Sequence, residues 1–200
     1  MATYDQKALE NAERSWRINF VNSLIGPKNL HVLITRFPSG GFNAAIFNSG
    51  VHIGSSPPYI GFILRPTSSP RHTYRNLLTY PYATLNAVAI TFYPQAHQTA
   101  AKLPDGESEI AQAGLDLTWE EGEDLPYLAQ SPLRARLHLA EVHTIQVNQT
   151  HLLVFAIEKV FSAIPPEADG FLRLDQLGLV AGSGCDAYWR LQFLERRPIP

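Results

Sequence analysis

The sequence predicts a mainly β fold in which many short strands form a barrel and short helices lie at its periphery. Runs rich in β-branched and aromatic residues alternate with turn residues along the chain. Only short segments show the apolar spacing of a helix. The chain has no Gly-x-Gly-x-x-Gly loop, which argues against a parallel sheet of the dinucleotide-binding type. Together these three observations favour an antiparallel barrel.

The expected strands are bounded by glycine, proline or polar clusters. The first run ends at the Pro-Ser-Gly-Gly turn of residues 38–41, so we expect it to form a hairpin with the second run. A Ser-Ser-Pro-Pro break at 55–58 separates the second run from the third. Residues 133–142 alternate apolar and polar side chains, as a half-buried antiparallel strand does. The expected strands are 31–37, 43–51, 59–65, 83–90, 133–142, 151–160, 171–174 and 187–194.

Short helices are expected between and before these strands. Near the N-terminus, Leu9, Ala12 and Trp16 are spaced to share one helical face. Pro81 stops a later helical pattern, because proline cannot continue a helix. The acidic segment Glu120–Asp124 reads as a solvated loop. The expected helices are 5–17, 73–80, 93–103 and 108–113.

Composition limits the class of protein. A chain of 200 residues with 45% hydrophobic and 17% charged residues suits one globular domain, residues 1–200. A net charge of −2 gives no sign of the basic surface that nucleic-acid binding requires. No apolar run approaches the roughly 20 residues of a membrane span, and the first residues lack a signal-peptide pattern. With a single cysteine, Cys185, no intrachain disulfide is possible. We therefore expect a cytoplasmic protein that binds neither nucleic acid nor membrane.

A polar turn before the helix at 73–80 has the chemistry of an anion site. Arg71, His72 and Thr73 lie where the helix begins, and first-turn N–H groups favour an anion. Arg65 arrives from the preceding strand and adds a charge-assisted donor. The alternative is an ordinary helix cap, with Thr73 or Ser69 as the capping side chain and Arg71 solvated. The second arginine favours a phosphate site.

The chain resembles the flavin reductase-like family, whose fold is the FMN-binding split barrel. The resemblance covers about residues 20–195, and it depends on the order and spacing of several motifs rather than on one of them. The residues that carry it first are Asn43, Phe47-Asn48-Ser49, Gly54-Ser55-Ser56-Pro57-Pro58, Arg65 and Arg71-His72-Thr73-Tyr74-Arg75-Asn76. It continues through 95–115, His151, Gly184 and Tyr188.

The resemblance implies where FMN would bind. The turn after the third strand would hold the phosphate through Arg71 and Thr73, then Arg65, and more weakly His72 and Asn76. The flavin ring would lie along the second strand and the turn that follows. An ordinary strand ending in a turn is the alternative for that segment. The implied ring contacts are Phe47, Asn48, Ser49, His52, Ile53, Gly54 and Ser55.

Two residues are candidates for a role near the reacting atoms. In relatives, a histidine matching His151 lies near the flavin and the nicotinamide; the alternative is a hydrogen-bonded structural histidine. Lys102 could reach a flavin oxygen or the nicotinamide cofactor, or it could lie on a solvated helix face. No metal site is expected, because no HExxH or clustered ligand spacing occurs. Cys185 reads as a partly buried structural thiol rather than a nucleophile.

The expected function is that of an FMN-binding flavoprotein, an NAD(P)H-dependent flavin reductase that transfers hydride to flavin. The resemblance implies a homodimer with bound FMN, a transient NAD(P)H co-substrate and a possible partner monooxygenase. Two alternatives stay open: a non-enzymatic FMN-binding electron-transfer protein, and a split-barrel oxidase or oxygenase acting on a small organic substrate. Negligible turnover with NAD(P)H would indicate the first alternative, and a requirement for an added organic substrate would indicate the second.

Overall fold

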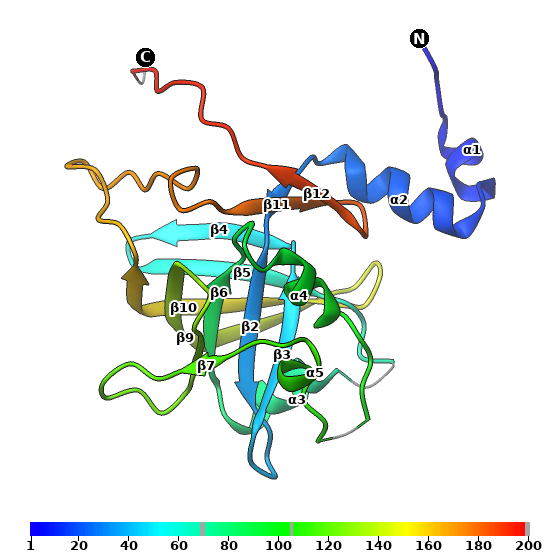
Figure 1. Cartoon of the computed structure of the whole chain (residues 1–200). Coiled ribbons are helices and arrows are strands. Elements are labelled where there is room, and N and C mark those ends of the chain that lie inside the picture. The colour runs from blue at the N-terminus through cyan, green and yellow to red at the C-terminus, as the bar shows by residue number, and fades with distance from the viewer. Residues whose placement is uncertain (69–70, 105, 199–200) are drawn as a thin grey trace.

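The computed structural model describes residues 1–68, 71–104 and 106–198. Within these residues, seven antiparallel strands form one curved sheet in the order β3-β2-β6-β9-β10-β5-β4 (Figure 1). The antiparallel pairing confirms the expected mainly β class. The strands are β2 (His31–Arg36), β3 (Phe42–Phe47), β4 (Gly50–Ser55), β5 (Pro58–Leu64), β6 (Tyr82–Ala87), β9 (Leu133–Ile145) and β10 (Thr150–Ser162).

Alternation of apolar side chains along these strands builds the barrel core. Side chains at every second position of a strand face the same side of the sheet. Leu33, Leu85, Leu137, Leu153 and Phe155 are each at most 6% exposed and belong to one buried cluster. Burying each such side chain contributes roughly 1.5–3 kcal/mol, so these strands cannot shift register by one residue without exposing the core.

A second, smaller sheet covers one end of the barrel. It has the order β1-β11-β12, from β1 (Lys28–Asn29), β11 (Val180–Ser183) and β12 (Ala187–Arg190). Backbone hydrogen bonds connect the two sheets: Leu30 N–H donates to Val180 O, and Val88 N–H donates to Leu30 O. A two-stranded ribbon, β7 (Leu117–Thr118) with β8 (Tyr127–Leu128), lies in the long insertion after β6.

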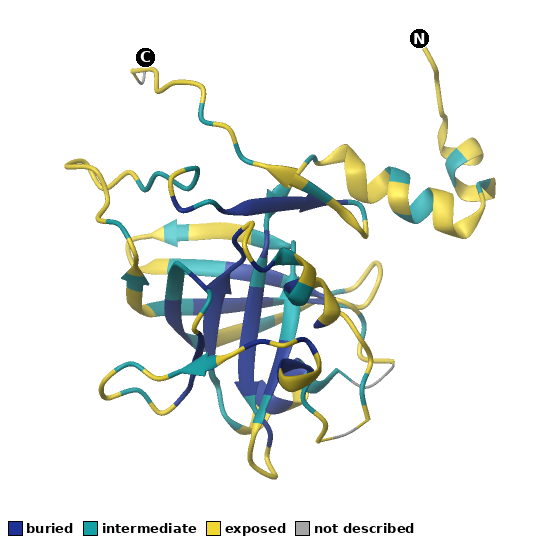
Figure 2. Cartoon of the chain, viewed as in Figure 1, coloured by how far each residue is buried: buried dark blue, intermediate teal, exposed yellow. Residues whose placement is uncertain are grey.

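The helices are short and peripheral. The expected helix at 5–17 is in fact two, α1 (Gln6–Asn11) and α2 (Arg14–Leu24), because the chain is extended at Ala12 and the Glu13 carboxylate caps a new helix. None of the described residues of α1 and α2 is buried, and both project from the barrel (Figure 2). The remaining helices are α3 (His72–Thr79), α4 (Tyr93–Gln98) and α5 (Glu109–Gln112).

Three strand expectations need correction. The run 43–51 is split at Asn48–Ser49, because the Ser49 hydroxyl donates to Ile63 O at 2.9 Å and accepts Ile63 N–H at 3.1 Å where the chain turns from β3 to β4. Residues 171–174 form no strand and lead instead into a series of turns. The last strand ends at Arg190 rather than at residue 194.

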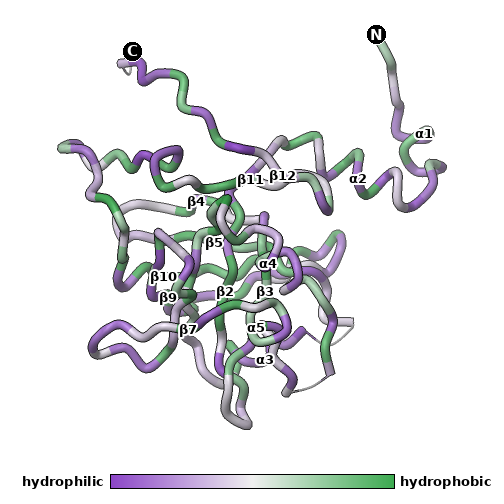
Figure 3. Tube along the Cα trace, viewed as in Figure 1, coloured by the Kyte–Doolittle hydropathy of each residue, from purple (hydrophilic) through white to green (hydrophobic). Residues whose placement is uncertain are grey.

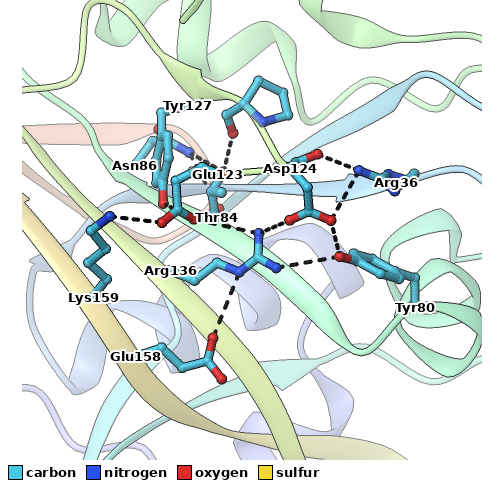
Figure 4. Close-up of polar contacts among 11 residues, drawn as sticks. Arg36, Tyr80, Thr84, Asn86, Glu123, Asp124, Tyr127, Arg136, Glu158 and Lys159 are labelled. Atoms are coloured by element: carbon cyan, nitrogen blue, oxygen red, sulfur yellow. Dashed lines mark hydrogen bonds and ion pairs between the residues drawn. The ribbon is translucent and has the colours of Figure 1, made fainter. Parts of the chain in front are cut away.

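The acidic segment is a loop, as expected, but it is not simply solvated. It takes part in a group of charged and phenolic side chains that we call the acidic-loop cluster (Figure 4). Arg136 Nη1 lies 2.7 Å from Asp124 Oδ1, and Lys159 Nζ lies 3.1 Å from Glu123 Oε1. The Glu123 side chain is only 10% exposed, because the loop folds back onto β9. The acidic-loop cluster comprises Arg36, Tyr80, Glu123, Asp124, Arg136, Glu158 and Lys159.

Candidate cofactor cavity

A cavity of about 610 Å³ lies where the barrel meets the smaller sheet. Its walls come from the end of β3, the end of β5, the start of α3, the insertion after α4, and the hairpin of β11 and β12. Asn22 and Ile25, at and beyond the end of α2, complete the rim. Volumes of about 300–1,000 Å³ are usual for sites that bind cofactors or other small molecules.

One end of the cavity is the N-terminus of α3. Arg71 is the N-cap residue, and its side chain makes no capping hydrogen bond to the described first turn. Its Nε instead donates to Pro66 O at 3.3 Å. Thr73 is 5% exposed, and its Oγ1 accepts a hydrogen bond from Asn43 Nδ2 at 3.2 Å. Within the described residues, the Thr73 hydroxyl donates to no acceptor, and the helix N-terminus favours an anion.

The cavity wall carries more positive than negative charge. Lys28, Arg65, Arg71 and Lys102 all line it. In the described part of the chain, no carboxylate lies within ion-pairing distance of these four side chains. Basic groups that are left unpaired around a hollow are suited to an anionic ligand such as a phosphate.

The predicted contacts to the flavin ring fall into two groups, those that line the cavity and those that do not. Phe47, Asn48 and Ser49 line the cavity. Phe47 packs edge-on against Phe62 with ring centroids 5.6 Å apart, and Asn48 Nδ2 approaches Gly184 O at 3.5 Å. Because both hydrogen-bonding functions of the Ser49 hydroxyl are taken by Ile63, its backbone rather than its hydroxyl is available to a ligand.

The structure does not bring the second group to this cavity. His52, Ile53, Gly54 and Ser55 lie on β4, an edge strand whose residues are mostly exposed, and none of the four is in the cavity wall. A bulge in the pairing of β4 with β5 falls between His52 and Gly54. These residues therefore surround the outer edge of the barrel in this chain.

Asn76 and His151 also lie behind the cavity wall rather than in it. Asn76 is fully buried, and its Nδ2 donates to Thr35 Oγ1 at 3.0 Å. His151 stacks on Tyr74 at 4.9 Å, and its ring nitrogens lie 3.1 Å from Thr144 Oγ1 and 3.4 Å from Thr67 Oγ1. Tyr74 belongs to α3 and Thr67 lies in the segment before this helix, so His151 contacts both sides of the turn that holds Arg71.

The insertion after β6 forms the opposite wall. Lys102 is exposed at the cavity, and His97 Nδ1 lies 2.5 Å from the Tyr188 hydroxyl of β12. Tyr93 packs against the same tyrosine, with ring centroids 5.0 Å apart. Burial, together with Asp186 and Tyr93, raises the pKa of Tyr188, so its hydroxyl keeps its proton.

Sequence reasoning missed several residues of the wall. Asn43 was named only as part of a motif, yet it is 1% exposed and holds Thr73. Glu109 lies in the 95–115 segment of the resemblance but was given no role, and Lys28 was part of no motif. Cys185 was expected to be a partly buried structural thiol; it is an exposed, free cysteine on the turn between β11 and β12. A buried asparagine within an apolar strand was the one available signal.

The described residues contain no group of three or more His, Cys, Asp or Glu side chains arranged to hold a metal ion. Within the same residues, no helix has the length and apolar character needed to cross a membrane.

Known proteins share this architecture. A profile of the flavin reductase like domain matches residues 27–170. A protein of Shewanella frigidimarina, assigned as a flavin reductase with a split barrel domain, is 31% identical over 100% of both chains, with a TM-score of 0.95. Nitrilotriacetate monooxygenase component B from Bacillus cereus is 18% identical over 98% of both chains, with a TM-score of 0.83. An FMN-binding protein from Thermus thermophilus is 17% identical over 99% of this chain and 100% of that one, with a TM-score of 0.72.

These likenesses define the class of protein: a split-barrel fold of the kind that binds flavin. Because the domain profile covers well over half of the sequence, the chain belongs to the flavin reductase-like family. The expected split barrel is thereby confirmed, and so is the resemblance on which it was based. Membership places the chain among flavin-using oxidoreductases.

Proposed function

We propose that residues 1–200 form one FMN-binding domain that works as an NAD(P)H-dependent flavin reductase in the cytoplasm. The observation that carries this proposal is the cavity whose wall holds Lys28, Arg65, Arg71 and Lys102 beside the N-terminus of α3. Among the described residues, Arg65 and Arg71 have no carboxylate partner and the Arg71 side chain does not cap α3. These features fit a phosphate, and family membership makes a flavin the matching ligand.

The residues present fit FMN in distinct roles. Arg71 and Arg65 would pair with the phosphate, and the Thr73 hydroxyl, oriented by Asn43, would donate to it. His72, in the same first turn, would add a further donor. Phe47 would supply an apolar wall for the ring, with Asn48 and the Ser49 backbone at its polar edge. When bound, the flavin supplies the hydride chemistry, accepting hydride from a nicotinamide and passing electrons onward.

The remaining candidates take supporting roles in this proposal. Lys102 would attract the anionic cofactor or co-substrate at the open side of the cavity. His151 and Asn76 would act as positioning residues, since they hold α3 and the turn before it from behind. No protein acid or base is required for hydride transfer itself, so orientation of the two nucleotides is the main contribution of the chain.

We further propose that the protein is a homodimer that delivers reduced flavin to a partner such as a monooxygenase. The dimer is supported by α1 and α2, where apolar and polar residues mix along the tube (Figure 3) and no described residue is buried. Tyr4, Trp16 and Phe20 form an aromatic group there, with Trp16 stacked on Phe20 at 4.7 Å. A helix with this much exposed apolar surface is suited to packing against another chain.

One spectroscopic experiment tests the catalytic proposal. Purified protein is incubated with FMN, desalted, and followed anaerobically in the visible range as NADH or NADPH is added. Rapid bleaching of retained flavin is the expected result, and the faster nucleotide identifies the donor. Retained colour without bleaching would favour the electron-transfer protein or the oxidase. If no flavin is retained, turnover with free FMN is measured, and absence of both binding and turnover refutes the proposal.

A further inference from the structure

Glu109 is an acidic residue in a cavity whose other charged groups are mainly basic. It is the first residue of α5, it is 5% exposed, and it lies in the cavity wall together with Arg71, His72 and Thr73. A buried carboxylate beside a site for an anion opposes binding through like-charge repulsion. The presence of this carboxylate in the wall of an anion site therefore needs a physical explanation.

The contacts of Glu109 place it next to the phosphate end of the cavity. Its Oε2 accepts a hydrogen bond from Ala44 N–H at 3.2 Å. The preceding residue, Ser108, donates from its hydroxyl to Phe42 O at 2.6 Å. Both bonds satisfy backbone groups of β3, the edge strand of the large sheet. Asn43, between these two positions of β3, is the residue that holds Thr73.

The charged groups around Glu109 leave its carboxylate without a close cation. Arg71 and His72 face it from α3, His97 from α4, and Lys102 from the insertion, but none of them forms an ion pair with it within the described residues. Burial raises the pKa of Glu109, while its backbone hydrogen bonds and the charge of His72 lower it less strongly. A phosphate arriving in the same cavity adds negative charge and favours the protonated carboxyl further.

We propose that Glu109 is a proton-linked positioning residue for the cofactor phosphate, so that FMN binding is coupled to proton uptake by this carboxyl. The inference depends on the proposed function, because it assumes a phosphate-bearing flavin in the cavity. The protonated carboxyl keeps an oxygen to accept Ala44 N–H and gains an O–H that can be donated. The ionised carboxylate keeps the first contact but repels the ligand. FMN affinity therefore falls as the pH rises through the range in which Glu109 ionises.

The test is titration calorimetry of FMN between pH 5.5 and 8.0, using the full chain and the Glu109→Gln variant. Glutamine keeps an oxygen for Ala44 N–H and cannot ionise. We expect about tenfold tighter binding by the variant at pH 8.0, which corresponds to a shift of one pKa unit on binding, and a difference that shrinks toward the acidic end of the range. Repeating the titration in buffers of different ionisation enthalpy counts protons directly. Uptake is expected for the unmodified chain and is expected to be smaller for the variant.

Three comparisons isolate the carboxyl. Glu107→Gln removes the same charge from an exposed position two residues away, so its pH profile should match that of the unmodified chain. His72→Asn removes the other titratable side chain of the turn and should preserve proton uptake. Riboflavin lacks the phosphate, and its affinity should not distinguish Glu109→Gln from the unmodified chain.

The outcomes separate this inference from the proposed function. Parallel FMN profiles for the unmodified chain and Glu109→Gln would overturn the role of Glu109, as would proton uptake lost in His72→Asn but kept in Glu109→Gln. If Glu109→Gln does not fold, proton counting on the unmodified chain and His72→Asn still decides, because absence of uptake in both refutes the inference. FMN binding at no pH, in any variant, would instead refute the proposed function.

Discussion

The two ends of α3 use charge in opposite ways. At its N-terminus, Arg71 lines the cavity together with Arg65 and Lys102, and no described carboxylate pairs with them. At its C-terminus, Tyr80 joins the acidic-loop cluster, in which Arg136 meets Asp124, Glu123 and Glu158 (Figure 4). Paired charges fix one loop to the barrel, whereas unpaired charges are left for a ligand. The same residue types therefore stabilise the fold in one place and form a proposed ligand site in the other.

The acidic-loop cluster and the cavity wall differ in how the chain covers their charged side chains. The acidic-loop cluster is closed over by its own chain: Thr84 donates to Pro126 O at 2.7 Å, and Leu128 N–H donates to Asn86 Oδ1 at 2.7 Å. Arg136 also lies over the Tyr82 ring at 4.6 Å. In the cavity wall, by contrast, Arg65 and Lys102 are exposed. Variants in the two regions should therefore have separable effects on stability and on binding.

The largest effect is expected for Arg136→Leu. The change removes a guanidinium whose side chain is 10% exposed and which lies 2.7 Å from Asp124 and 3.8 Å from Glu123, while Glu123 keeps Lys159. Removing one partner of a buried ion pair costs about 3–5 kcal/mol. We expect the free energy of unfolding in urea to fall by about 3 kcal/mol while FMN affinity stays unchanged. Arg190→Leu, at an exposed position with no ion pair among the described residues, is the control. A loss below about 1 kcal/mol would mean that the cluster behaves like ordinary surface pairs.

Arg71→Ala should show the reverse pattern. Removing a guanidinium that pairs with phosphate should weaken FMN binding by about 1–3 kcal/mol, measured by titration calorimetry. The free energy of unfolding should change little, because the only hydrogen bond recorded for this side chain among the described residues is to Pro66 O. Arg14→Ala, on the exposed helix α2, provides a matched loss of charge. Unchanged FMN affinity would remove Arg71 from the phosphate site.

The two regions should also respond to pH with opposite sign. Burial alone would raise the pKa of Asp124, but hydrogen bonds from Tyr80 and Arg136 and the charges of Arg136 and Arg36 outweigh it, so the pKa is lowered. Its contribution to stability is present above the usual value of 3.8 and is lost as the pH falls through the lowered value. For Glu109 the pKa is raised, so stability falls as the pH rises above its usual 4.5.

Urea unfolding between pH 3 and pH 8 measures both effects. The stability difference between the unmodified chain and Asp124→Asn should shrink toward the acidic limit. The difference between Glu109→Gln and the unmodified chain should grow in favour of the variant above pH 4.5. If the two variants shift stability in the same direction across the range, the two regions do not differ in the way that their contacts indicate.

The smallest effect is expected for Tyr188→Phe. The variant removes the hydroxyl that lies 2.5 Å from His97 Nδ1 and joins α4 to β12 across the cavity. A single hydrogen bond contributes about 0.5–1.5 kcal/mol, so we expect a stability loss at the lower end of that range and a few-fold weaker FMN binding. Tyr93→Phe is the control, since it keeps the ring packing against Tyr188 and no hydrogen bond of its hydroxyl is recorded in the described residues. Equal effects of the two changes would assign the contribution to the rings.

Much of the fold could be predicted from local patterns. The alternation in 133–142 identified β9, the apolar run 151–160 identified β10, and Pro81 marked the end of α3. Patterns failed where a distant side chain decides the outcome. The split of 43–51 depends on Ser49 bonding to Ile63, which is 14 residues away. Glu123 was predicted to be solvated because the residues near it in the sequence give no sign that Arg136 and Lys159 are its partners.

In the candidate site too, local features could be predicted from the sequence, whereas contacts between distant segments could not. The basic turn of Arg71 and Thr73 was identifiable because a helix start with a cation is a local feature, whereas the cavity as a whole is assembled from five separate segments. Glu109 reaches Ala44 across 65 positions of sequence, so no spacing rule could have assigned it to the phosphate end. His52 to Ser55 are local to Asn48 and Ser49, yet the turn between the strands carries them to the outer edge.

The sequence by itself determined the strand periodicity, the turns and the family of this protein, because those properties follow from side-chain order along a short length of chain. Only the tertiary structure decided which charges are paired and which remain free. Ion pairing depends on distances of a few ångströms between residues far apart in sequence, and folding sets those distances when it buries the apolar faces of the strands. Arg136 lies within strand β9 and Arg71 is the N-cap residue of α3, so the same side chain occurs in both settings. Their surroundings alone make one a stabilising centre and the other a candidate ligand for phosphate.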